Sequence, residues 1–216
     1  MSQLFRNRAE AGRDLAVLLE KYRGPGTLVL GLPRGGVVVA AAVAQDLGCE
    51  QSVIVSRKIG APDNPEYALG AVAEGGGAVI NEPEVAALGL TSVWLEAEIR
   101  RQEEEIARRI ELYRFGAPLP VIRDRPVIVV DDGVATGLTM LAALRTLRNQ
   151  GARVVVMATP VIPPMTLDRL RPECDEAIVI VAPEPFYAVG MFYQDFEQVE
   201  DDEVIRLLST RRQCAA

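Results

Sequence analysis

Apolar runs of the length of buried strands recur along the chain, and segments with helical periodicity separate them. The apolar runs are rich in β-branched residues and cover residues 27–30, 52–55, 127–130, 153–158 and 177–181. Apolar residues spaced three and four apart predict helices at residues 6–22, 37–47, 91–114, 138–150, 165–170 and 201–208. Because strands that alternate with helices build parallel sheets, the pattern predicts an α/β fold with a doubly wound, mostly parallel sheet.

The segment between the second and third runs departs from this alternation. Residues 70–80 predict a β-hairpin with a glycine-rich turn, and residues 81–90 predict a loop or a short helix. The helix predicted at residues 91–114 has Thr91 or Ser92 as its N-cap and carries one narrow apolar stripe. Its supporting ion pairs are Glu96–Arg100, Glu104–Arg108 and Glu105–Arg109. Such a stripe is typical either of a helix that covers its own sheet or of a helix that packs on a partner subunit.

The composition narrows the class of protein. At 216 residues the chain has the length of one domain, residues 1–216, in which residues 81–125 would be a helical elaboration. A net charge of −7 and a pI near 4.8 argue against a nucleic-acid partner, which needs a basic surface. No membrane segment is expected, since Pro33 and Arg34 interrupt the longest apolar run.

The small number of cysteines and the absence of histidine also exclude several kinds of catalytic and metal site. The three cysteines are scattered, without the spacing of a metal site, and the N-terminus lacks the apolar core of a signal peptide. Both features predict a cytoplasmic protein. The chain has no histidine, which excludes Ser-His-Asp and Cys-His catalysis and histidine-ligated zinc.

The strongest candidate site is the segment Val127–Thr139. A buried strand ends at the adjacent acids Asp131 and Asp132, and a loop of small and hydroxyl residues leads into a helix that begins near Leu138. Ligands of open α/β sheets bind at the carboxyl ends of the strands. Free N–H groups at a helix N-terminus suit a phosphate, and carboxylates suit sugar hydroxyls or hydrated Mg²⁺.

This segment resembles the ribose-phosphate motif of type I phosphoribosyltransferases: four apolar residues, two acids, three variable residues, Thr-Gly, one variable residue, and Thr or Ser. The resemblance implies that Asp131 and Asp132 bind the ribose hydroxyls of phosphoribosyl pyrophosphate, and Mg²⁺ through water. It implies that the 5′-phosphate lies in the loop formed by Gly133, Val134, Ala135, Thr136, Gly137, Leu138 and Thr139. The alternative is an ordinary strand–turn–helix with an acidic cap.

Two further segments carry cations to the same predicted edge of the sheet. The glycine-rich loop after residues 27–30 occupies the place of the family's pyrophosphate loop, which implies this role for Leu32, Pro33, Arg34, Gly35 and Gly36. Glycines permit close backbone approach there, and Arg34 adds a guanidinium fork for phosphate.

Residues 56–69 are rich in Gly, Pro, Asp and Asn, which predicts a mobile loop. The segment resembles the flexible catalytic loop of adenine-type phosphoribosyltransferases. The resemblance implies that Arg57 and Lys58 contact pyrophosphate oxygens while the loop closes over the reaction and excludes water. The alternative is a solvated basic pair at a turn.

Aromatic residues crowd together after the last predicted strand, and aromatic rings there can stack on a planar base or form a local core. The segment partly resembles the base-binding hood of purine phosphoribosyltransferases, which implies a hood at residues 182–200. The implied base contacts are Phe186, Tyr187, Val189 and Tyr193. The sequence departs from the family pattern by one inserted residue, and Gln194 stands where the family has Asp.

The resemblance covers residues 27–196, except for 81–125. It implies a Mg²⁺-dependent homodimeric phosphoribosyltransferase that transfers the phosphoribosyl group to a nitrogenous acceptor. The acceptor stays open, because Ala135 and Gly70 replace the acids that handle the acceptor proton in purine enzymes. Asp63, Glu66 or Glu74 could substitute. Two alternatives remain: a regulatory protein that binds the ligand without catalysis, and an interaction module that acts through its long helix.

Overall fold

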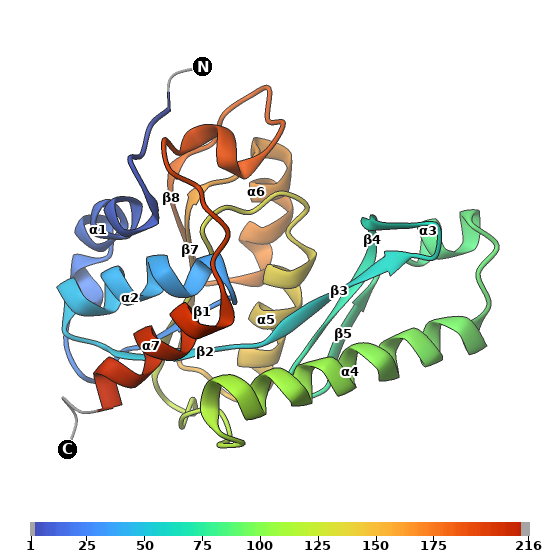
Figure 1. Ribbon diagram of the computed structural model, residues 1–216, viewed down its shortest axis with the longest axis horizontal. Helices are drawn as coiled ribbons and strands as arrows, with labels where there is room; N and C mark the ends of the chain where they lie inside the picture. The colour runs from blue at the N-terminus through green and yellow to red at the C-terminus, as the bar shows by residue number, and fades with distance from the viewer. Residues whose placement is uncertain (1–2, 213–216) are drawn as a thin grey trace.

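Five parallel strands form the main sheet, in the spatial order β2-β1-β6-β7-β8 (Figure 1). The computed structural model describes residues 3–212, without the side chains of Glu66 and of residues 210–212. The strands are β1 (Leu28–Gly31), β2 (Glu50–Val53), β6 (Pro126–Val130), β7 (Val154–Val161) and β8 (Glu176–Val181). Each strand pairs in parallel with its neighbours. The predicted doubly wound, mostly parallel α/β sheet is confirmed.

Helices cover both faces of this sheet. Alternate residues of a strand point to opposite faces. Leu28 and Leu30 of β1 therefore belong to the core that includes α5, whereas Val29 belongs to the core that includes α1 and α2. Because both faces are covered, the strands are continuous apolar runs rather than alternating ones. The four covering helices are α1 (Arg8–Leu18), α2 (Gly35–Leu47), α5 (Leu138–Asn149) and α6 (Pro164–Leu170).

A second, antiparallel sheet extends from the edge of the first. It consists of β3 (Ser56–Ala61), β4 (Asn64–Ala73) and β5 (Gly77–Ile80). Helix α4 (Ser92–Arg114) packs on this sheet, and we call β3, β4, β5 and α4 together the arm. Figure 1 shows the arm reaching away from the main sheet.

The structure confirms the hairpin predicted at residues 70–80 but not the loop predicted at residues 56–69, which forms β3 and the first half of β4. The turn-forming residues of this segment occupy only a short turn at Pro62–Asp63. The flanking residues pair across the hairpin, and Ile59 and Leu69 are buried against the rest of the arm. Backbone pairing and apolar burial on one face therefore outweigh the local turn propensity.

The long helix covers the arm with its apolar stripe. Thr91 caps it by accepting a hydrogen bond from the backbone N–H of Trp94. Ile106 and Tyr113 are buried in the core of the arm, and Trp94 packs against that core. Of the three predicted ion pairs, Glu105–Arg109 is formed at 2.8 Å. The contacts support the interpretation of α4 as a covering helix, and the homodimer stays a prediction.

A buried ion pair joins the arm to the main sheet. Arg114, at the end of α4, pairs with Glu74 in the β4–β5 turn and donates to the carbonyl of Val53 at the end of β2, at 3.1 Å. Glu74 also accepts a hydrogen bond of 2.7 Å from the backbone N–H of Val55. Burial raises the pKa of Glu74, although Arg114 opposes the shift. Three segments of chain therefore meet at this pair.

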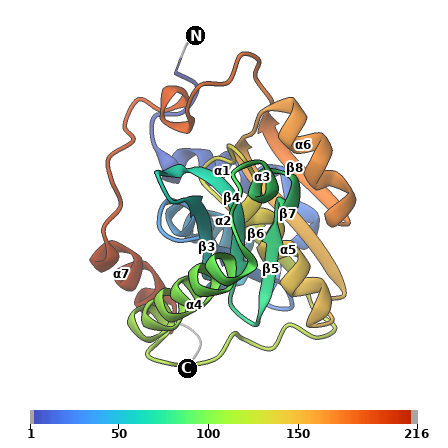
Figure 2. The same cartoon turned by 90° about the vertical axis from the view of Figure 1, so that its right-hand side faces the viewer.

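The two ends of the described chain complete the fold. Backbone hydrogen bonds join Phe5 to Phe192 and Gln194, so the N-terminal segment packs beside the predicted hood. Helix α7 (Asp201–Arg212) lies beside α4 (Figure 2). Shorter segments are η1 (Glu20–Tyr22), α3 (Glu82–Ala87), η2 (Arg171–Glu173) and η3 (Val189–Phe192).

The structure also bears on the predictions about the cysteines and about membrane-spanning segments. Cys49 and Cys174 are buried, and Cys214 lies outside the described residues. Among residues 3–212, no helix combines the length and the apolar character needed to cross a bilayer.

Candidate functional site

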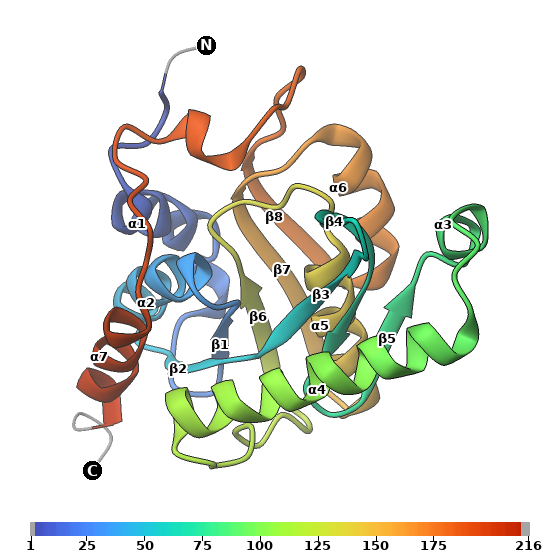
Figure 3. The ribbon, with the colours of Figure 1, turned by 45° about the vertical axis from the view of Figure 1, so that its right-hand side comes forward.

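Neighbouring strands β1 and β6 end level with each other at the carboxyl edge of the main sheet (Figure 3). Gly31 pairs with Val130, and the backbone N–H of Leu32 donates to the carbonyl of Val130 at 2.8 Å. From these strands the chain winds toward β2 on one side and toward β7 and β8 on the other. Such a switch point is where open α/β sheets bind ligands. The loops at residues 32–36 and 131–137 both begin there.

Glycines bring the first of these loops against the acids. A Cβ atom on Gly35 would lie 1.9 Å from Oδ2 of Asp132, and one on Gly36 would lie 2.9 Å from Cα of Asp131. Neither position has room for a side chain. The peptide bond between Pro33 and Arg34 in this loop is cis. The structure therefore brings together the two sets of residues predicted for pyrophosphate and ribose.

The two acids form a partly buried pair. Oδ1 of Asp131 accepts the backbone N–H of Asp132 at 2.9 Å. Burial raises the pKa of both carboxyls, and the negative charge of Asp132 adds to the rise at Asp131. Arg8 opposes the rise in the pKa of Asp132 through a 2.6 Å contact between Nε and Oδ2. Asp131 is therefore the acid that takes up a proton more readily.

Sequence reasoning missed Arg8. It lies 124 residues from Asp132 in the chain, at the start of α1, and belongs to no motif. Its guanidinium also donates to the carbonyl of Glu197 at 2.8 Å and stacks over the ring of Phe196, 3.8 Å from the ring centroid. No pattern in the sequence marks this arginine, because its partners become neighbours only in the folded chain.

The predicted phosphate loop presents backbone N–H groups at the start of α5. Thr166 donates to the carbonyl of Ala135 at 2.8 Å, and Arg169 donates to the carbonyl of Thr136. Across a trans peptide, the N–H points opposite to the carbonyl. The N–H groups of Thr136 and Gly137 therefore point away from α6. Together with the first N–H groups of α5, which have no intrahelical partner, they suit an anion.

The predicted pair Arg57 and Lys58 is split between the two faces of the arm sheet. Arg57 lies opposite Val72, which packs in the core with α4, and its Nε donates to Oε1 of Gln102 on α4 at 3.2 Å. Lys58 lies opposite Ala71, which packs in the core with α5. Consecutive residues of a strand point to opposite faces, so the two cations do not act on one anion in this conformation.

The third predicted cation, Arg34, lies in the loop beside the acids. Its guanidinium approaches Oδ1 of Asp201 on α7 at 3.9 Å, and both side chains are about one third exposed. At this distance the pair is weak, and Arg34 remains accessible to an anionic ligand.

The predicted hood residues have different environments. Tyr193 is buried between Phe5 and Phe196 and donates to the backbone carbonyl of Asp132 at 2.6 Å, so it presents no free face to a base. Burial raises its pKa. Phe186 stacks on Phe192, and Val189 touches Gly133 in the phosphate loop. Tyr187 is 72% exposed and is available for stacking.

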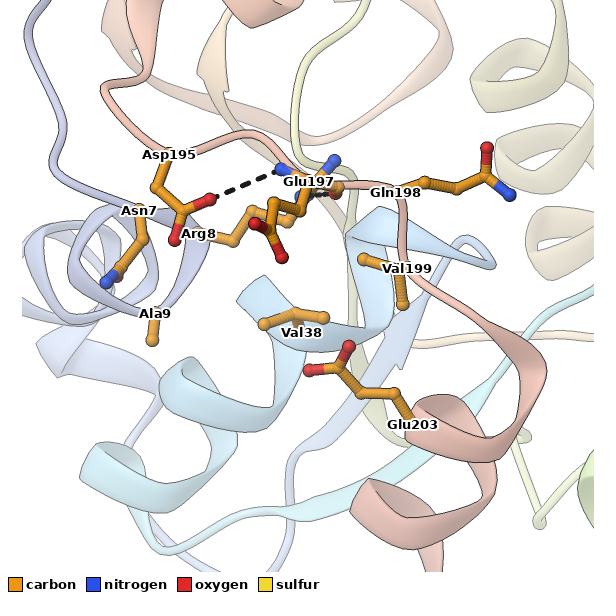
Figure 4. Close-up of a pocket in the computed structure, with 9 residues that line it drawn as sticks. All are labelled: Asn7, Arg8, Ala9, Val38, Asp195, Glu197, Gln198, Val199 and Glu203. Carbon is orange, nitrogen blue, oxygen red and sulfur yellow. Dashed lines mark hydrogen bonds between the residues drawn. The ribbon is translucent and has the colours of Figure 1, made fainter.

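A cavity of about 270 Å³ lies beside Arg8, between α1, α2 and the segment leading into α7 (Figure 4). Three carboxylates line it, from Asp195, Glu197 and Glu203, together with apolar groups such as Val38. Figure 4 shows Asp195 accepting the backbone N–H of Glu197, at 3.3 Å. This cavity lies next to the acid pair, and no motif predicted it.

The acids suggested as proton acceptors are not equivalent. Glu74 is buried in its ion pair with Arg114 and cannot serve a ligand without breaking that pair. Asp63 is exposed in the β3–β4 turn, and the side chain of Glu66 is outside the described residues. Ala135 is exposed in the phosphate loop but carries no acid.

The acid pair fits a metal ion only in part. No cluster of three or more metal-ligating side chains occurs among residues 3–212. Asp131 and Asp132 provide carboxylate oxygens, but one oxygen of Asp132 already contacts Arg8. Mg²⁺ keeps several waters and takes substrate oxygens as ligands, so two carboxylates are sufficient when a phosphorylated substrate supplies the rest.

Comparison with known proteins agrees with this geometry. Residues 2–187 match the family model described as phosphoribosyl transferase domain. A Mycobacterium tuberculosis protein, named provisionally as a phosphoribosyl transferase, is 41% identical over 206 residues, which are 95% of this chain and 46% of that protein. A uracil phosphoribosyltransferase of Aeropyrum pernix is 32% identical over 134 residues, 57% of this chain and 58% of that protein. This chain spans about half the length of these curated relatives.

A solved structure supports the same fold. The crystal structure of the protein TT1426 from Thermus thermophilus is 44% identical in sequence, with a TM-score of 0.79, and the match covers 95% of this chain and 97% of that one.

Proposed function

This chain belongs to the phosphoribosyl transferase domain family, and from this membership we propose that it transfers the 5-phosphoribosyl group of phosphoribosyl pyrophosphate to a nitrogenous acceptor. Pyrophosphate is the leaving product. A lone pair of the acceptor nitrogen forms the bond to C1′, and the bond from C1′ to the pyrophosphate oxygen breaks with its electron pair. The acceptor then gives up a proton to water or a carboxylate.

One observation carries the proposal. The loop at residues 32–36 packs so closely on Asp131 and Asp132 that only glycine fits at positions 35 and 36. A ligand with a diol at the acids would therefore have a neighbouring anionic group against this loop, and a second anionic group at the start of α5 would lie on the other side. Phosphoribosyl pyrophosphate has that arrangement of groups.

Each set of residues has a distinct task in the proposed reaction. Asp131 and Asp132 hold the ribose hydroxyls and stabilise the positive charge that develops on C1′. The backbone N–H groups of residues 136–139 hold the 5′-phosphate. Arg34 and Lys58 are the proposed protein cations for pyrophosphate, and Mg²⁺, when bound near the acid pair, would offset the charge of the leaving group. Because the groups are held in place before reaction, positioning supplies much of the rate enhancement.

The test is release of pyrophosphate from phosphoribosyl pyrophosphate in the presence of Mg²⁺, across a panel of purines, pyrimidines including uracil, and simple amines. We expect turnover with at least one acceptor and loss of that turnover in Asp131→Asn. Turnover with no member of a broad panel would contradict the transferase.

A second candidate follows from the missing acid. Neither Ala135 nor Gly70 can handle a proton, and Glu74 is committed to Arg114. These features favour a regulatory protein that binds phosphoribosyl pyrophosphate or a nucleotide without catalysis. Micromolar binding measured by calorimetry, with no turnover of any acceptor, would support this candidate over the transferase.

A further inference from the structure

We propose that Arg8 is a positioning residue for the acid pair. It fixes the carboxylate of Asp132 so that this carboxylate accepts a hydrogen bond from a hydroxyl of a phosphorylated pentose. The inference rests on the proposed function of the acids and extends the site to a helix that carries no motif.

The contact between the two side chains is close and largely shielded from water. Nε of Arg8 lies 2.6 Å from Oδ2 of Asp132, and the side chains are 11% and 14% exposed. The backbone of Asp132 is held separately, because its N–H donates to Asp131 and its carbonyl accepts the hydroxyl of Tyr193. The remaining freedom of Asp132 is rotation of its carboxylate, and the bond to Arg8 removes it.

Arg8 is itself held on two further sides. Its NH1 donates to the carbonyl of Glu197, and its guanidinium plane lies over the ring of Phe196. A guanidinium fixed by a carboxylate, a carbonyl and an aromatic face has one orientation. A lysine would supply the charge but neither the fork nor the stacking plane.

The position of Arg8 also affects the charge that a ligand meets. A Cβ atom on Gly35 would lie 2.9 Å from Nε of Arg8, so the guanidinium adjoins the predicted pyrophosphate loop as well as the acids. Two uncompensated carboxylates would repel an anionic sugar. Arg8 offsets the charge of Asp132 and leaves Asp131 to the ligand, because its salt bridge is to Oδ2 of Asp132.

A double-mutant cycle with ribose 5-phosphate as the probe tests the inference. Affinities are measured by calorimetry for the wild type, Arg8→Met, Asp132→Asn and the double variant. Each single substitution is expected to weaken binding about tenfold, as for loss of a hydrogen bond to a charged group. If Arg8 acts through Asp132, the double variant also loses about tenfold, whereas independent effects would multiply to about a hundredfold.

Three controls separate positioning from folding. Arg13→Met removes an exposed arginine from the same helix and is expected to leave the affinity unchanged. Arg8→Lys is expected to recover part of the loss through its charge. Thermal melts of all variants check folding, and Arg8→Gln replaces Arg8→Met in the cycle if the latter does not fold.

The possible outcomes are distinct. Wild-type affinity in Arg8→Met, or a multiplicative loss in the double variant, overturns the role of Arg8 and leaves the proposed function standing. Failure of the wild type to bind either ribose 5-phosphate or phosphoribosyl pyrophosphate overturns the proposed function, and this inference with it.

Discussion

The main sheet and the arm place their paired charges in different ways. In the main sheet, Asp131 and Asp132 come after the last residue of β6, so both acids lie at one edge. In the arm, Arg57 and Lys58 lie inside β3, so they point to opposite faces. Two adjacent charges therefore cooperate beyond a strand end and separate within a strand.

Burial shows a second difference between the two regions. The pair Arg8–Asp132 keeps some exposure and lies at the carboxyl edge of the main sheet, where we propose that the ligand binds. The pair Glu74–Arg114 is enclosed where three segments meet and has a structural role. The same kind of contact thus belongs to the proposed binding site in one region and to a structural ion pair in the other.

The largest expected effect is on stability, when the buried ion pair between Glu74 and Arg114 is broken. Glu74→Ala leaves Arg114 buried without its carboxylate, which is expected to lower the free energy of unfolding by about 3–5 kcal/mol. Urea unfolding followed by circular dichroism measures it. Glu104→Ala, an exposed change on α4, is the control and should stay within about 0.5 kcal/mol. A loss of similar size in both variants would contradict a structural role specific to Glu74.

In contrast to Glu74→Ala, Asp131→Asn is expected to weaken ligand binding without lowering the stability of the fold. Loss of the charged acceptor is expected to weaken binding of phosphoribosyl pyrophosphate by about 10- to 100-fold. The melting temperature of the ligand-free protein should stay the same or rise, since burial disfavours the charged form of Asp131. Calorimetry and thermal melts provide the two measurements. Exposed Asp46→Asn is the control, and a large drop in stability of Asp131→Asn would refute the expected division between binding and folding.

The pH dependence of stability tests whether Asp131 is protonated in the folded protein. The pKa of Asp131 is raised in the folded protein by burial and by Asp132. Its stabilising contribution is thus fully present below the pKa of an unfolded aspartate, about 3.9, and is lost as pH rises through the raised pKa. Melting temperatures between about pH 4 and about pH 7, with a chelator, should fall less steeply in Asp131→Asn than in the wild type. Parallel curves would show that Asp131 does not titrate in this range.

The smallest expected effect is the difference in KM between variants of Lys58 and Arg57, the two cations of β3. Lys58→Ala is expected to raise the KM for phosphoribosyl pyrophosphate about fivefold, the effect of one partly exposed charge, and Arg57→Ala should change it less. Steady-state kinetics at low ionic strength measures the difference. Equal effects of the two variants would mean that β3 rearranges on binding and brings Arg57 to the other face.

Features encoded by neighbouring residues were predictable, and contacts between distant segments were not. The strand before Asp131, the helix beginning at Leu138 and the mostly parallel character of the main sheet follow from short apolar patterns. Only residues 56–69 of the arm were predicted as a loop, because their pairing depends on strands that bury one face against α4. Arg8 was missed for a related reason, since its partners lie far away along the chain.

The aromatic residues of the predicted hood show a further limit of prediction from the sequence. A run of aromatic residues predicts either stacking on a ligand or a local core, and the rings of this run differ in exposure. Tyr193 is enclosed by Phe5 from the opposite end of the chain, whereas Tyr187 remains exposed. Composition located the cluster, but only the path of the N-terminal segment determines which ring a ligand could reach.

The Glu74–Arg114 ion pair holds one end of the arm to the main sheet. A rotation about that end would displace the turn at Pro62–Asp63 most, since that turn is at the other end of the paired strands. Trp94 lies in the arm, packed against its core, and is the sole tryptophan of the chain. The protein thus contains its own optical reporter: a change in tryptophan emission on adding phosphoribosyl pyrophosphate would record movement of the arm without any label.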